Sequence, residues 1–132
     1  MKKKISIVSP TYNEEQNVDQ FYSLVSEVMS GLSLDYDIVF IDNASTDRTV
    51  EKLRKLADLD KRVKLIINAR NFGHIRSPYY GVLQAGGDAI VLMASDLQDP
   101  PEMLRDLVAS WEEGNKVVLA VKASSDEGWI LK

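Results

Sequence analysis

Residues 5–15 read Ile-Ser-Ile-Val-Ser-Pro-Thr-Tyr-Asn-Glu-Glu, a short apolar run that ends in a cluster of polar side chains. Further short runs rich in Val and Ile follow along the chain. Nearly continuous apolar runs of this length are typical of strands that are buried on both faces of a sheet. The sequence therefore predicts five strands: Ile5–Ser9, Asp37–Ile41, Val63–Ile67, Ala89–Met93 and Val117–Val121.

Amphipathic helical patterns separate the predicted strands. In the first, Asn13 followed by Gln16 resembles a capping box, which predicts a helix that begins at Glu14. Alternation of strands and helices at this spacing predicts right-handed βαβ units, and therefore an α/β fold with a mostly parallel sheet flanked by helices. The predicted helices span Glu14–Gly31 and Asp47–Leu59, and two more begin near Ser77-Pro78 and at Asp99.

Composition limits the classes of function. With 132 residues the chain is long enough for one domain, and we expect a single domain over residues 1–132. The net charge of −4 gives no broad basic surface, so no nucleic acid partner is expected. The absence of cysteine excludes disulfides and thiol catalysis and fits a cytoplasmic location. No apolar run approaches the roughly 18 residues of a membrane span, so the chain is expected to be soluble.

Polar side chains follow each of the first four predicted strands. Because ligands of parallel α/β sheets bind at the carboxyl ends of the strands, these clusters predict a binding edge. The same residue types also form ordinary turns and helix caps, so the prediction depends on their recurrence after four strands. The clusters are Pro10–Glu15, Asp42–Asp47, Asn68–His74 and Ala94–Asp99.

The kind of ligand follows from what the first loop lacks. No glycine occurs before Gly31 and no Gly-Lys-Ser/Thr triplet is present, which excludes the common dinucleotide and P-loop phosphate cradles. A nucleotide would then be held by side chains and a metal ion. Asp42 suits a base N–H, and the oxygens of Asp96, Gln98 and Asp99 suit Mg²⁺ or Mn²⁺.

Four motifs resemble, in order, those of the family 2 glycosyltransferases, over Ile5 to about Val121. They are residues 7–15 (Ile-Val-Ser-Pro-Thr-Tyr-Asn-Glu-Glu), 41–47 (Ile-Asp-Asn-Ala-Ser-Thr-Asp), 71–74 (Asn-Phe-Gly-His, followed by Gly81) and 96–102 (Asp-Leu-Gln-Asp-Pro-Pro-Glu). The last motif is similar to that of the polyprenyl-phosphate sugar transferases. The resemblance implies a GT-A, Rossmann-like fold, and a chain that holds the donor-binding part and stops before the acceptor part.

The resemblance also implies roles for individual residues. It places Pro10, Tyr12 and Glu14 at the base and ribose pocket, Asp42 on the base, and Arg70, Asn71, Gly73 and His74 near the donor. It places Asp96 and Gln98 on the metal and the diphosphate. This sequence departs from the family pattern at two places: Ala94 replaces the first Asp of an Asp-x-Asp motif, and Asn43-Ala44 replaces Asp-Gly.

A transferase is the function that the resemblance implies. It would move a sugar from a nucleotide-diphosphate sugar, with a UDP-sugar favoured, to a polyprenyl phosphate with inversion, using Mg²⁺ or Mn²⁺. The lipid acceptor implies action at the cytoplasmic face of a membrane. An anionic phosphate acceptor needs no general base, and no catalytic residue is assigned.

Two other functions are open alternatives. The departure at Ala94 leaves room for a non-catalytic module that binds nucleotide sugars. A receiver-type signalling domain has a similar length and an acidic edge, but its phosphorylated Asp would follow the third strand, where this chain has Ile67-Asn68-Ala69. An exposed sheet edge would also favour a homo-oligomer.

Overall fold

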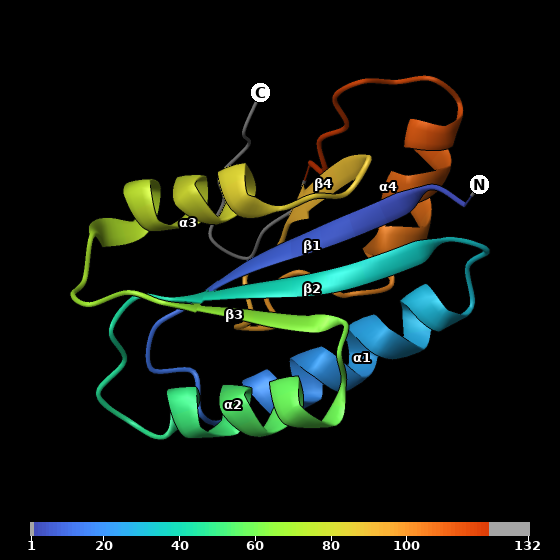
Figure 1. The fold of residues 1–132 in the computed structure, drawn as a ribbon. Helices are drawn as coiled ribbons and strands as arrows, with labels where there is room; N and C mark the ends of the chain where they lie inside the picture. The colour runs from blue at the N-terminus through green and yellow to red at the C-terminus, as the bar shows by residue number, and fades with distance from the viewer. Residues whose placement is uncertain (1, 122–132) are drawn as a thin grey trace.

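The computed structural model of the chain describes residues 2–121. Its four strands form one parallel sheet in the order β3-β2-β1-β4 (Figure 1). The chain therefore winds outward from β1 to β3 and then returns to pair β4 on the other side of β1. This reversal creates a topological switch point between β1 and β4. The strands are β1 (Lys4–Thr11), β2 (Asp35–Asp42), β3 (Val63–Ile67) and β4 (Ala89–Leu92).

Helices cover both faces of the sheet, as predicted. Three of them, α1 (Val18–Ser30), α2 (Thr49–Leu59) and α4 (Met103–Glu112), pack on one face. The fourth, α3 (Gly73–Gln84), lies across the opposite face over β1 and β2 (Figure 1). The parallel sheet with helices on both faces confirms the predicted α/β class.

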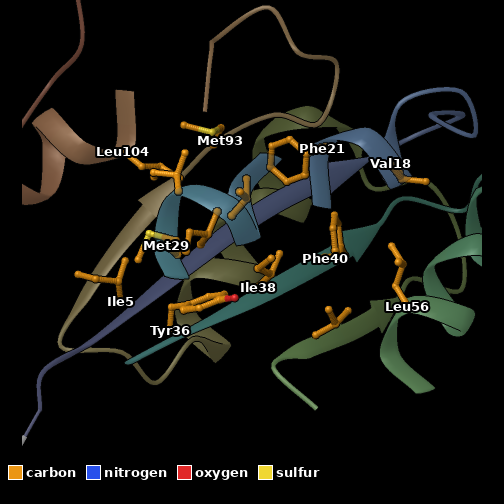
Figure 2. Close-up of a cluster of buried hydrophobic side chains, with 14 of the residues drawn as sticks. Ile5, Val18, Phe21, Met29, Tyr36, Ile38, Phe40, Leu56, Met93 and Leu104 are labelled. Carbon is orange, nitrogen blue, oxygen red and sulfur yellow. The ribbon is translucent and has the colours of Figure 1, made fainter. Parts of the chain in front are cut away.

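The larger core lies between the sheet and the helices of the face that carries α1 (Figure 2). Ile5 and Ile7 of β1 and Ile38 and Phe40 of β2 point into it, because alternate residues of a strand face the same side. The ring of Phe40 meets Phe21 of α1 edge-on, with centroids 6.0 Å apart. These apolar side chains fix α1 against β1 and β2, and so fix where the loop between β1 and α1 emerges.

The opposite face of the sheet packs closely against α3. Val8 and Ile41 form part of a second, smaller core there. A Cβ at Gly81 of α3 would lie only 3.0 Å from Val8 Cγ1 and 3.1 Å from Ile41 Cγ2. Glycine at this position therefore lets the helix backbone approach the sheet.

The predicted start of the first helix is wrong. Helix α1 begins at Val18, with Asn17 at its N-cap position, and residues 14–17 form a turn. Asn13 does not cap it, because its side-chain oxygen instead accepts hydrogen bonds from the N–H groups of Thr46 and Asp47, at 2.8 and 3.3 Å. The partner of Asn13 is thus another loop and not its own helix.

Two further helix starts also differ from the prediction. Helix α3 begins at Gly73, four residues before Ser77, and contains Pro78 in its second turn. Asn71 Oδ1 accepts the Gly73 N–H at 2.8 Å, so the helix finds a partner for its first donor there. Helix α4 begins at Met103 because Pro100 and Pro101 lie in a turn that precedes it.

The fifth predicted strand is wrong as well. Residues 117–121 belong to no strand, and Val117, Leu119 and Val121 are 79%, 81% and 69% exposed. An apolar run becomes a strand only when its backbone finds a hydrogen-bonding neighbour, and this segment forms no ladder with β4. It lies instead beside a cavity of about 670 Å³, which is bordered by β4 and α4.

Candidate functional site

Asp42 lies at the carboxyl end of β2 with none of its surface exposed. Its Oδ1 accepts hydrogen bonds from the Thr11 hydroxyl at 2.8 Å and the Ser45 hydroxyl at 2.6 Å, and its Oδ2 accepts from the Ser45 N–H at 2.9 Å. All three donors are neutral, so they hold the carboxylate without cancelling its charge. A base N–H reaches Oδ2 only if the atoms that cover it move aside.

The loops after β1 and β2 are held together by side chains. Asn13 accepts from the N–H groups of Thr46 and Asp47, and Asp47 accepts from the Thr49 N–H at 2.9 Å and the Glu15 N–H at 3.4 Å. Burial raises the pKa of the Asp47 carboxyl, but the hydrogen bonds from Thr49 and Glu15 outweigh it and hold the pKa below its ordinary value. Asp47 therefore links the two loops.

The loop after β3 is attached to the end of β2 through Asn43. The Phe72 N–H donates to Asn43 Oδ1 at 2.8 Å, and Asn43 Nδ2 donates to Asn71 Oδ1 at 2.9 Å. Three of the four predicted polar clusters thus contact one another, with the end of β2 at their centre. Of the predicted site residues, Asp42, Asn71 and Gly73 are brought into this network or beside it.

The remaining predicted donor residues lie around this network. Pro10 is half-buried at the end of β1, and the Tyr12 side chain that follows it is 49% exposed. The carboxylate of Glu14 accepts from the Asn17 side chain at 2.9 Å. On the other side, the Arg70 guanidinium lies 4.7 Å from the centre of the Phe72 ring, and His74 is exposed.

The fourth cluster lies after β4, on the far side of β1 from β2. Asp96 is half-buried, and its Oδ1 accepts the Gln98 N–H at 3.2 Å across a tight turn. Leu97 within this turn has a φ of +64°, which is strained for a bulky residue. Ser95 is buried, and its hydroxyl has no hydrogen-bond partner among the described residues. The turn thus presents Asp96 at the switch point.

The oxygens of this turn fit one kind of metal site. Among residues 2–121, no three His, Cys, Asp or Glu side chains come together, so these residues form no site that would hold a metal by protein side chains alone. Ala94 stands where the family pattern has another Asp, so the oxygen-bearing side chains of this segment are Asp96, the exposed Gln98 and the half-buried Asp99. Mg²⁺ is usually held by one or two carboxylates together with substrate phosphates and water. These residues therefore fit a metal that is completed by a diphosphate.

Sequence reasoning missed several residues of the network. Thr11 and Ser45 lie within predicted clusters, yet nothing in the sequence marked them as partners of Asp42. The parallel register that pairs Thr11 with Asp42 is the signal that identifies the contact, and it becomes visible only once β1 and β2 are known to be neighbours. Asn43 was noted only as a departure from a family pattern.

The structure is thus a parallel α/β sheet with carboxylates and amides at the carboxyl ends of its strands and with no glycine-rich loop after β1. A family model described as glycosyl transferase family 2 matches residues 6–131. The chain belongs to this family, and the GT-A interpretation of the sequence is confirmed.

Similar proteins cover the chain almost completely. An uncharacterised glycosyltransferase of Bacillus subtilis, YkcC, is 43% identical over 89% of the chain and 36% of its own length. A prophage bactoprenol glucosyl transferase homologue of Escherichia coli is 37% identical over 98% of the chain and 42% of its own length. The mannosyltransferase PcManGT of Pyrobaculum calidifontis, solved with GDP-Man and Mn²⁺, is 19% identical over 89% of the chain and 34% of its own chain, with a TM-score of 0.70.

The chain is shorter than these relatives. It spans about two fifths of the length of the two curated proteins. No helix within residues 2–121 has the length and apolarity needed to cross a membrane.

Proposed function

We propose that the protein transfers a sugar from a nucleotide-diphosphate sugar, with a UDP-sugar favoured, to a polyprenyl phosphate at the cytoplasmic face of a membrane. Membership of glycosyl transferase family 2 and the likeness to a bactoprenol glucosyl transferase homologue support this proposal. The observation that carries it is that two aspartates flank β1 at the carboxyl edge of the sheet. Asp42 lies on one side, buried at the end of β2 and hydrogen-bonded to neutral donors, and Asp96 lies on the other side, after β4.

The proposed reaction is a single displacement. An oxygen of the lipid phosphate attacks the anomeric carbon of the sugar and forms a new C–O bond. The bond from that carbon to the donor's β-phosphate oxygen breaks, and the nucleoside diphosphate leaves with the electron pair. Attack opposite to the leaving group inverts the anomeric centre. The acceptor is already anionic, so no proton has to be removed from it.

The residues of this chain would bind and orient the donor. Asp42 would accept an N–H of the base, and Tyr12 and Glu14 on the loop after β1 would border the base and ribose. Asp96 and Gln98 would hold Mg²⁺ or Mn²⁺ together with the diphosphate. The metal supplies electrostatic stabilisation of the charge that develops on the leaving group.

Calorimetric titration of the purified protein with UDP and GDP, each with and without Mn²⁺, tests this proposal. We expect UDP to bind only when Mn²⁺ is present, and Mn²⁺ alone to bind at least about tenfold more weakly than with UDP, because the protein offers few ligands. Preference for GDP would correct the base and leave the rest of the proposal intact. Absence of binding by both nucleotides would contradict it.

Variants locate the two ends of the bound donor. Asp42→Asn and Asp96→Asn keep the shapes of the side chains, and each should weaken UDP binding about 10- to 100-fold, the value of a hydrogen bond to a charged group. Asp58→Asn on the exposed surface of α2 is the matched control and should bind like the parent. Equal affinity in all four proteins would place the nucleotide elsewhere.

A non-catalytic module that binds nucleotide sugars is the second candidate, because Ala94 leaves the metal-binding turn with a single aspartate before Gln98. The two candidates differ in turnover. Incubation of the protein with a radiolabelled UDP-sugar, Mn²⁺ and vesicles that contain a polyprenyl phosphate should label the lipid if the transferase proposal is correct. Binding without labelled lipid would favour the module.

A further inference from the structure

Asn43 is a buried amide at the point where the loops after β2 and β3 meet. Only 7% of the residue is exposed. Its Nδ2 donates to Asn71 Oδ1 at 2.9 Å and to the Gly73 carbonyl at 3.2 Å. Its Oδ1 accepts from the Phe72 N–H at 2.8 Å and from Asn68 Nδ2 at 3.2 Å. Both donors and both lone pairs of the amide are therefore used inside the protein.

The backbone partners fix the orientation of this amide. The Phe72 N–H can only donate and the Gly73 carbonyl can only accept, so Oδ1 must face Phe72 and Nδ2 must face Gly73. Asn71 is fixed in the same way, because its Oδ1 also accepts the Gly73 N–H at 2.8 Å. Rotation of either side-chain amide would break a contact with the backbone, so the network has one arrangement.

We propose that Asn43 is a positioning residue that sets the 71–74 loop and thereby the affinity for the sugar-nucleotide donor. The effect on donor affinity rests on the proposed function, because the 71–74 loop is expected to lie near the donor. The effect of Asn43 on the position of the loop does not. Asn43 has no hydrogen-bonding capacity left for a ligand, so it acts through the loop. Asn71, Phe72 and His74 of the loop are exposed, and Asn43 is their buried attachment to the sheet.

This role requires an amide. A carboxylate of the same shape would still accept from Phe72 and Asn68, but it would face two acceptors, Asn71 Oδ1 and the Gly73 carbonyl, with no hydrogen to donate. The Asn71 side chain could turn its own NH₂ toward the carboxylate, but the Gly73 carbonyl is fixed by the start of α3. A buried carboxylate that faces the Gly73 carbonyl with no hydrogen between the two oxygens is costly, so the loop is expected to move away from it.

The loop has a second attachment that limits how far it can move. Asn68 Nδ2 also donates to Ser77 Oγ at 2.8 Å, which connects the end of β3 to the buried side of α3. Asn68 Nδ2 also donates to Asn43, but its bond to Ser77 does not need Asn43 as a partner, so loss of the Asn43 network should displace the 71–74 loop while β3 and the rest of α3 stay in place. The expected effect is therefore local.

Hydrogen exchange and nucleotide binding together test the proposal. We expect the amide hydrogens of Phe72 and Gly73 to exchange at least about tenfold faster in Asn43→Asp and Asn43→Ala. The alanine removes the acceptor of the Phe72 N–H, and in the aspartate variant the displaced loop weakens the contacts of both groups. Amides of β1 and β2 should keep their protection. UDP with Mn²⁺ should bind about 5- to 20-fold more weakly to both variants, a range expected for loss of one or two hydrogen bonds.

Two controls separate positioning from general damage. Asn115→Asp makes the same chemical change at an exposed amide that donates to the Ser110 carbonyl at 2.9 Å, and it should alter neither measurement. Val108→Ala in the core beneath α4 lowers overall stability away from the loop, and it should leave UDP affinity unchanged at a temperature where it stays folded. If Val108→Ala weakens UDP binding as much as Asn43→Asp, positioning is refuted.

The outcomes also separate this proposal from the proposed function. If the parent protein binds no nucleotide, the proposed function fails, while the exchange rates of Phe72 and Gly73 still decide whether Asn43 holds the loop. If the parent binds UDP and Asn43→Asp binds it equally well, the positioning role is overturned and the proposed function stands. Unchanged exchange at Phe72 in Asn43→Ala would overturn it independently of any nucleotide.

Discussion

Strand β2 carries a buried aspartate near each end, and the two are held in different ways. Asp37, near the amino end, lies 2.9 Å from the ammonium of Lys4 and 3.3 Å from that of Lys64. Asp42, at the carboxyl end, receives hydrogen bonds only from neutral groups of Thr11 and Ser45. Both are nearly or fully buried, at 3% and 0% exposure.

Under the proposed function, the aspartate at the amino end of β2 is structural and the one at the carboxyl end binds the donor. Two cations lie against Asp37 Oδ2 and balance its charge within the protein, while its buried Oδ1 has no hydrogen-bond partner among the described residues. Asp42 has only neutral donors, and the proposal assigns it the base N–H at the carboxyl edge, where parallel sheets bind, once the atoms that cover it move aside. Substitutions can separate these two proposed roles of the same residue type on one strand.

The largest effect is expected from Asp42→Ala. Truncation leaves the Thr11 and Ser45 hydroxyls and the Ser45 N–H without their shared acceptor in a buried place. At about 1–3 kcal/mol for each unpaired group, partly relieved by water, the free energy of unfolding should fall by about 3–5 kcal/mol. Urea unfolding followed by circular dichroism measures this. A loss below about 1 kcal/mol would show that the carboxylate does not hold the two loops.

Asp37→Asn should have a smaller effect that depends on pH. Burial raises the pKa of the Asp37 carboxyl, but the hydroxyl of Ser6 and the ammonium groups of Lys4 and Lys64 outweigh it and keep the pKa below its ordinary value of 3.8. Because the folded state binds this proton less readily, the carboxylate contributes stability above pH 3.8 that is lost as pH falls through the lower pKa. At pH 7 the variant should lose about 1.5–3 kcal/mol.

Unfolding at low pH therefore distinguishes a loss of ion pairs from a loss of side-chain packing in Asp37→Asn. The difference between parent and Asp37→Asn in the free energy of unfolding should shrink toward zero as pH is lowered from 5 to about 2, because the parent carboxyl becomes neutral as well. UDP affinity at pH 7 should stay within about twofold of the parent, in contrast to Asp42→Asn. A difference that persists at low pH would assign the loss to shape.

The sequence predicted the strands that carry the site better than the side-chain contacts within it. Val- and Ile-rich runs identified β1 to β4, because strands buried on both faces need such residues whatever their neighbours are. The run at 117–121 was misassigned, because a strand also needs a backbone partner and apolar character alone does not supply one. The start of α1 was misassigned because Asn13 finds its partner at Thr46, 33 residues away.

The same limit applies to the site. Asp42 and the amide-rich loop were predicted because they follow strands, and strand ends are ordered along one edge. The hydrogen bonds of Asn43 to the loop after β3 were not predictable. Its four partners lie 25 to 30 residues away in the sequence, and the contacts depend on how that loop folds back. Local pattern thus places chemical groups, whereas cross-loop hydrogen bonding decides what they do.

The smallest effect on stability is expected from Ala44→Gly, in the turn that places Ser45 against Asp42. Ala44, between the two, has a φ of +62°, a left-handed conformation that glycine adopts without strain. Ala44→Gly removes this strain but adds freedom to the unfolded chain, so we expect a net gain of only about 0.5 kcal/mol in the free energy of unfolding. UDP affinity should not fall, because the Ser45 N–H keeps its direction.

Ala109→Gly is the matched control, since Ala109 is exposed in helix α4, where glycine costs about 0.5–1 kcal/mol relative to alanine. Opposite signs for the two Ala→Gly exchanges would show that the backbone at Ala44 is held in its unfavourable conformation by the hydrogen bonds to Asp42. Loss of stability in both would mean that Ala44 is not strained. In that case the turn, and not the carboxylate, would determine where Ser45 lies, and the distinction between the two aspartates of β2 would weaken accordingly.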